Sequence, residues 1–266
     1  MKRLLLFVAF LLVLGIQALP QHLVVATHAV LGELAAVVGG EAVIVSTIIP
    51  SGFCPGHYDL SPGNLASLLE ADLVIYSGIE PWVEQLGEHT QANALAQLPG
   101  PWNSPSAAAA QLNAIAELLS DRMPEHAEAI QSRRDAYLDS LTALESELLS
   151  RAEEVGTAGI PVLCMQWQSG FVSWLGFEIA ESFAPPSTLS LRDLIALANQ
   201  GVEASAQVVI DNLQSGIEFG AKLAREVGAV HAVLTNFPGA LPQTASLLDM
   251  LRRNAEALFS AIEPIG

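Results

Sequence analysis

One uninterrupted helical pattern in the middle of the chain separates two regions in which strand and helix patterns alternate. The segment 124–155 has a proline only at its first position, and Gly156 follows it as a stop signal. Its apolar residues recur at helical spacing on one face, at Ile130, Tyr137, Leu141, Leu144 and Leu148. We therefore expect one long helix between two α/β regions.

The flanking regions predict parallel sheets. Before the long helix we expect strands at 23–27, 42–49 and 73–77 and helices at 29–38, 62–70 and 104–119. After it we expect strands at 160–165, 208–211 and 230–234 and helices at 170–175, 217–227 and 244–262. Such alternation is typical of βαβ units. The two regions also echo each other, because Ser61-Pro62 and Ser190-Leu191 each open a helix that leads to an apolar strand. The predicted fold class is α/β, with lobes at 19–123 and 156–266 joined by the helix 124–155.

The N-terminus resembles an export signal. Lys2 and Arg3 precede an apolar run of 13 residues, 4–16, and Ala18 is a plausible cleavage point. Thirteen residues are too few to span a bilayer comfortably. We expect residues 1–18 to be a signal peptide, the mature chain to be periplasmic or otherwise extracytoplasmic, and no stable membrane insertion after its removal.

The charge balance argues against two classes of partner. The chain has 11 basic and 28 acidic residues, a net charge of −17, and loss of the two basic residues in the signal segment makes it −19. Such a surface repels nucleic acid and anionic lipid. We therefore expect no nucleic-acid partner.

A loop rich in Pro and Gly carries the two side chains with the strongest metal-binding chemistry. In Ile49-Pro50-Ser51-Gly52-Phe53-Cys54-Pro55-Gly56-His57-Tyr58-Asp59-Leu60-Ser61-Pro62, a thiol and an imidazole lie three residues apart after a strand pattern. Thiolate and imidazole are the donors that zinc favours. The alternative interpretation is a tight turn with a buried Cys and a surface His.

This loop, with Ser61-Pro62 and the helix and strand up to Gly78, resembles that of the solute-binding proteins of zinc and manganese ABC importers. In that family the loop His is the first metal ligand, and His57 occupies its position. The resemblance implies two lobes joined by a rigid helix, a metal site in the cleft between them, and delivery to an ABC transporter permease. It also implies a monomer that is not an enzyme.

The other three family ligands are absent from this chain. The segment Pro99-Gly100-Pro101-Trp102 has Gly where the family has its second His, no His or Glu opens the second lobe around Cys164 and Gln166, and Asn236 replaces the late carboxylate. His28 and Cys54 are candidate replacements from the first lobe, with Cys164, Gln166 and Asn236 from the second. We predict a zinc site formed by His57, Cys54, His28, Cys164, Gln166 and Asn236, with manganese or copper as alternative metals.

Each candidate also has a structural alternative. His28 could satisfy a backbone group at a helix entry, and Cys54 could be a buried turn thiol or form a disulfide with Cys164. Two rival functions remain open. A cysteine hydrolase would use Cys54 and His57, but two residues three apart in one Pro-rich loop rarely align as nucleophile and base. A family member with an altered cleft would bind another ligand or act as an adhesion or accessory protein.

Overall fold

The computed structural model describes residues 21–86 and 95–263. The predicted signal peptide, 1–18, lies outside these described residues. Within them, no helix combines the length and the apolar character needed to cross a membrane.

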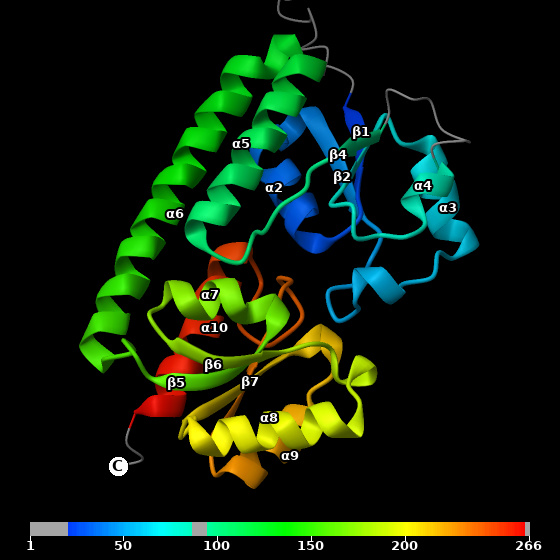
Figure 1. The fold of residues 1–266 in the computed structure, drawn as a ribbon. Coiled ribbons are helices and arrows are strands. Elements are labelled where there is room, and N and C mark those ends of the chain that lie inside the picture. The colour runs from blue at the N-terminus through cyan, green and yellow to red at the C-terminus, as the bar shows by residue number, and fades with distance from the viewer. Residues whose placement is uncertain (1–20, 87–94, 264–266) are drawn as a thin grey trace, which may run out of the picture.

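The N-terminal lobe is a parallel sheet in the order β2-β1-β3-β4 with helices around it (Figure 1). Its strands are β1 (His22–Ala26), β2 (Val43–Thr47), β3 (Leu73–Tyr76) and β4 (Leu95–Gln97). Its α-helices are α2 (Ala29–Gly39), α3 (Pro62–Glu70), α4 (Val83–Leu86) and α5 (Pro105–Arg122), and short 3₁₀ turns lie at η1 (Gly40–Ala42) and η2 (Pro55–His57).

The C-terminal lobe repeats this topology, with a parallel sheet in the order β6-β5-β7-β8. Its strands are β5 (Pro161–Met165), β6 (Glu178–Phe183), β7 (Val208–Asn212) and β8 (Val230–Leu234). Its α-helices are α7 (Ser169–Trp174), α8 (Leu191–Glu203), α9 (Glu218–Val227) and α10 (Leu247–Ile262), with 3₁₀ turns η5 (Gln166–Gln168), η6 (Pro186–Thr188) and η7 (Leu213–Ser215).

The echo between the two halves of the sequence corresponds to equivalent helix starts. Ser61 caps α3 and Ser190 caps α8, and each forms a capping box with the residue three positions later, Asn64 or Asp193. Both helices lead from the second to the third strand of their lobe. The prediction of two similar lobes is confirmed.

The long helix α6 (Ala127–Val155) follows the turn η4 (Pro124–His126) and runs along both lobes (Figure 1). Gly156 ends it in a left-handed conformation with φ 73°. Four residues of the predicted apolar face are buried, Ile130, Leu141, Leu144 and Leu148, and Tyr137 packs against them. The helix is confirmed as a single element.

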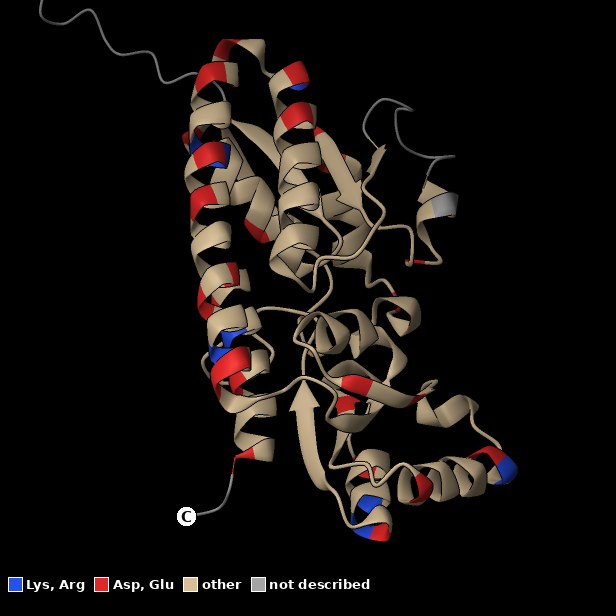
Figure 2. Cartoon of the chain, turned by 60° about the vertical axis from the view of Figure 1, so that its left-hand side comes forward, with Lys and Arg blue, Asp and Glu red and all other residues tan. Residues whose placement is uncertain are grey.

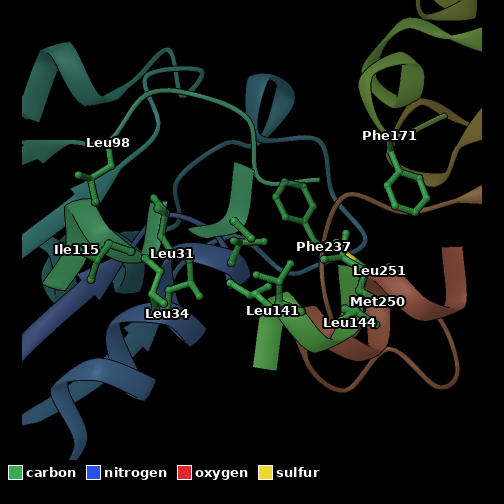
Figure 3. Close-up of a cluster of buried hydrophobic side chains, with 14 of the residues drawn as sticks. Leu31, Leu34, Leu98, Ile115, Leu141, Leu144, Phe171, Phe237, Met250 and Leu251 are labelled. Atoms are coloured by element: carbon green, nitrogen blue, oxygen red, sulfur yellow. The ribbon is translucent and has the colours of Figure 1, made fainter. Parts of the chain in front are cut away.

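One hydrophobic core continues through both lobes. Leu141 and Leu144 of α6 lie between Leu34 of α2 and Met250 of α10 in the same buried cluster (Figure 3). Because α6 contributes to both sides of this cluster, the two lobes cannot separate there without exposing apolar surface.

A half-buried carboxylate adds a polar connection between the lobes. Both oxygens of Glu33 on α2 accept hydrogen bonds from the backbone N–H of Leu247, the first residue of α10, at 2.9 and 2.8 Å. The Tyr137 hydroxyl of α6 donates to the same carboxylate at 3.1 Å. Burial raises the pKa of Glu33, and these hydrogen bonds oppose that effect. One side chain thus connects three helices.

Two edge strands, β4 and β6, lie outside the predicted set. β4 has only three residues. The sequence of β6, EIAESF, carries two glutamates and is mostly half-buried, with only Phe183 fully buried. Both lack the apolar runs that mark the central strands.

Candidate functional site

A cleft of about 690 Å³ lies between the lobes, where the carboxyl ends of both sheets face each other. Residues after seven of the eight strands line it, which is where open α/β sheets place their ligands. Among the described residues of this lining, the ionisable side chains are Cys54 and His57. Figure 2 shows the same pattern at larger scale, since the charged residues lie mostly along the long helices and the loops between the lobes are largely uncharged.

The loop after β2 brings Cys54 and His57 to the cleft. The Phe53 N–H donates to the Pro50 carbonyl at 2.9 Å, and the His57 N–H donates to the Cys54 carbonyl at 3.0 Å, so two consecutive turns fix the loop. His57 is exposed and Cys54 is half-buried. Of the predicted ligands, His57, Cys54 and Asn236 line the cleft.

Carboxamides form the opposite wall. Gln168 is fully buried, and its Nε2 donates to Oδ1 of Asn212 at 3.0 Å and to Oδ1 of Asn236 at 2.9 Å. The Nδ2 of Asn212 donates a hydrogen bond to the Ser215 hydroxyl at 3.0 Å. Gln214 accepts from the Asn236 N–H at 3.2 Å. These bonds set the orientation of both asparagine side chains through their oxygen atoms.

Three hydrogen bonds cross between the lobes around the cleft. Trp102 Nε1 donates to the Asn236 carbonyl at 2.8 Å, and Asn103 Nδ2 donates to the Trp167 carbonyl at 3.0 Å. Gln214 Nε2 donates to the Ser51 carbonyl at 2.7 Å. The lobes are therefore in contact in this state.

His28 lies behind the cleft and is not part of its lining. It is 1% exposed and packs against Trp102 and Phe237, with ring centroids 4.6 and 5.2 Å away. Neither ring nitrogen has a hydrogen-bond partner in the described structure. Burial lowers the pKa of His28 from 6.5 to about 4, and the nearby Glu80 partly opposes this. The structure thus places a neutral imidazole within an aromatic cluster, and not the expected cleft ligand.

Two further predicted ligands are also away from the cleft. Cys164 is fully buried in β5, where its thiol donates to the Met165 carbonyl at 3.3 Å, and burial raises its pKa to about 12. Gln166 is exposed but does not line the cleft. Both cysteines are free. This corrects the expectation that Cys54 and Cys164 both face the site, because β5 is a central strand with packed core on both of its faces. Val162, Leu163, Cys164 and Met165 are all 0% exposed.

The predicted ligands do not gather into a preformed cage. Across 21–86 and 95–263, no three His, Cys, Asp or Glu side chains are close enough to hold one metal ion. Gly100 lines the cleft with φ +117°, a conformation that L side chains rarely adopt, and a Cβ there would lie 3.2 Å from Gln111 Nε2. The backbone at this position is therefore unsuited to the His that the resemblance would place there.

Sequence reasoning missed the carboxamide wall. Asn236 was among the predicted ligands, but Asn212, Gln168 and Gln214 lie outside the predicted set. Their position at the carboxyl end of β7 or in the turns that follow β5 and β7 was the available signal, because this edge of the sheet faces the cleft in this topology.

The fold and the cleft define a two-lobed binding protein with one continuous backbone helix. The family model for the zinc-uptake complex component A, periplasmic, matches residues 24–261. The chain belongs to this family, which is that of the substrate-binding proteins of metal ABC transporters.

Similar proteins are named for different metals. The chain is 28% identical over 153 residues to the manganese-binding lipoprotein MntA of Bacillus subtilis, covering 49% of this chain and 50% of that protein. It is 26% identical over 153 residues to the iron-binding protein YfeA of Yersinia pestis, covering 50% of this chain and 49% of that one. The chain thus matches about half the length of these relatives.

Solved structures share the fold over more of the chain. A zinc-bound ZnuA deletion mutant has a TM-score of 0.78 at 20% identity and covers 93% of this chain and 100% of its own. A manganese-bound periplasmic metal-binding protein from Candidatus Liberibacter asiaticus has a TM-score of 0.79 at 15% identity, with 91% and 100% covered. At these identities the likeness concerns the fold.

Proposed function

We propose that this chain is an extracytoplasmic solute-binding protein that captures a zinc-containing cargo in its inter-lobe cleft and delivers it to an ABC transporter permease. One observation carries the proposal: His57, with its imidazole, and Cys54, with its thiol, line the cleft from one turn in a protein of this family. Imidazole and thiolate suit zinc better than manganese, which favours carboxylate and carbonyl oxygens.

The form of the chain supports capture and release. The parallel sheet of each lobe has its strand ends at the shared cleft. The long helix α6 and the hydrophobic core around it hold the two lobes in a fixed relative position. The hydrogen bonds across the cleft involve loops rather than core strands. Loops can break such bonds on cargo entry without exposing the core.

Metal content tests this function. The chain, purified without chelator from cells grown with a mixture of zinc, manganese, iron and copper salts, should carry zinc in excess of the other metals, measured by elemental mass spectrometry. His57→Ala should lose most of this zinc, and His126→Ala, in η4, should retain it. Manganese in excess, or equal zinc in the wild type and His57→Ala, would contradict the proposal.

A further inference from the structure

The cleft is much larger than a bare metal ion and its donors are few. Its volume of about 690 Å³ falls in the range of pockets that hold small organic molecules. A zinc ion needs about four ligands, and the cleft offers one imidazole and one thiol. Other ligand atoms must therefore come from elsewhere.

Aromatic surfaces occupy the space that further metal ligands would need. Trp167 is 53% exposed at the cleft, and Trp102 and Phe237 stack with ring centroids 5.8 Å apart. Exposed indole faces of this kind bind flat, conjugated groups. Ile79 and Pro101 extend the apolar lining.

The carboxamide wall provides an oriented hydrogen-bond donor. Gln168, buried and with an unpartnered Oε1, holds Asn236 through Oδ1. This orientation leaves the Asn236 Nδ2 hydrogens to donate to a group in the cleft. Amide donors recognise carboxylate or carbonyl oxygens without adding charge.

We propose that the cargo is a metal chelate: a zinc ion already held by a small, planar organic chelator with carboxylate oxygens, whose open coordination position His57 fills. This rests on the proposed function, and it names the form in which the metal arrives. Chelator oxygens supply the missing ligands, and their charge neutralises the metal. This matches a cleft whose lining, in the part of the chain that the structure describes, has no Asp, Glu, Lys or Arg. Trp167 stacks on the chelator and Asn236 donates to it.

Calorimetric titration with defined probes separates this cargo from a bare ion. The four probes are zinc sulfate, the 1:1 zinc–dipicolinate complex, the 1:1 zinc–nitrilotriacetate complex and dipicolinate alone. The zinc–dipicolinate complex is planar and neutral, whereas the zinc–nitrilotriacetate complex is non-planar and charged. A bare-ion site loses zinc to dipicolinate. We expect zinc–dipicolinate to bind about tenfold more tightly than zinc sulfate or zinc–nitrilotriacetate.

Three variants assign the contacts. Trp167→Ala, at an exposed position, should weaken zinc–dipicolinate about fivefold and leave zinc sulfate unchanged. His57→Ala should weaken both. Asn236→Asp, which keeps the oxygen that accepts from Gln168, should tighten zinc sulfate and weaken zinc–dipicolinate, because it replaces an amide donor with a carboxylate.

The outcomes distinguish the two proposals. If zinc sulfate binds through His57 as tightly as zinc–dipicolinate, or if zinc–nitrilotriacetate equals zinc–dipicolinate, the chelate inference is overturned and the proposed function stands. If neither zinc nor its chelates bind, or if His57→Ala binds them all as the wild type does, both fail.

Discussion

The indole Nε1 of Trp102 donates to the backbone carbonyl of Asn236 at 2.8 Å, joining the N-terminal lobe to the C-terminal lobe across the cleft. Trp102→Phe removes this bond and keeps most of the ring. We expect the free energy of unfolding to fall by about 1 kcal/mol, measured by urea denaturation. Trp174→Phe, in α7 outside the cleft lining, is the matched control for loss of an indole. Equal losses in the two variants would show that the cross-lobe bond contributes nothing.

Glu33 should be a main polar connection between the lobes. Glu33→Ala leaves the N–H of Leu247 and the hydroxyl of Tyr137 without their acceptor. We expect a loss of about 2 kcal/mol in unfolding free energy. Glu41→Ala, at an exposed position in η1, should change it by less than about 0.5 kcal/mol. A Glu33→Ala variant as stable as Glu41→Ala would contradict this role.

His28 should make the protein less stable in acid. Burial lowers its pKa from 6.5 to about 4, so between these values the unfolded chain binds a proton that the folded chain does not. Stability is therefore complete above about pH 6.5 and declines as the pH falls toward 4, by about 3 kcal/mol in total from this group. His28→Phe, which suits the aromatic cluster, should remove this component. Unfolding free energies of the two proteins that fall in parallel from pH 7 to pH 4 would disprove it.

The two cysteines should react very differently with a thiol reagent. Cys54 is at the cleft surface, and Cys164 is fully buried with its pKa raised to about 12. In the folded protein we expect Cys54 to be modified first and Cys164 only after unfolding, since the thiolate is the reactive form. Zinc should slow the modification of Cys54. The Cys164→Ala variant should keep the fast phase, which assigns that phase to Cys54. If the wild type shows no fast phase, or if zinc does not slow it, the result would argue against Cys54 as a ligand.

The central architecture was predictable because it depends on local patterns. Apolar runs marked the central strands, the Gly- and Pro-free segment marked α6, and Ser61 and Ser190 marked equivalent helix starts. The edge strands β4 and β6 were not predicted, because β4 is only three residues long and β6 contains polar residues that interrupt an apolar run.

The site was less predictable because it depends on which way each side chain faces. His28 and Cys164 carry ligand chemistry, yet aromatic packing buries His28 and the central position of β5 in its sheet buries Cys164. Conversely, Gln168 and Asn212 have ordinary side chains that acquire a role only when β5 and β7 lie side by side. The place of His57 at the cleft was predictable because its loop follows β2 at the carboxyl end of the sheet.

Zinc titration of the wild type, His57→Ala and His126→Ala, followed by calorimetry, tests the central claim most directly. The account predicts about one zinc site per chain in the wild type, affinity reduced about tenfold or more in His57→Ala, and wild-type affinity in His126→Ala. Wild-type affinity in His57→Ala, or no zinc binding by any of the three proteins, would contradict it.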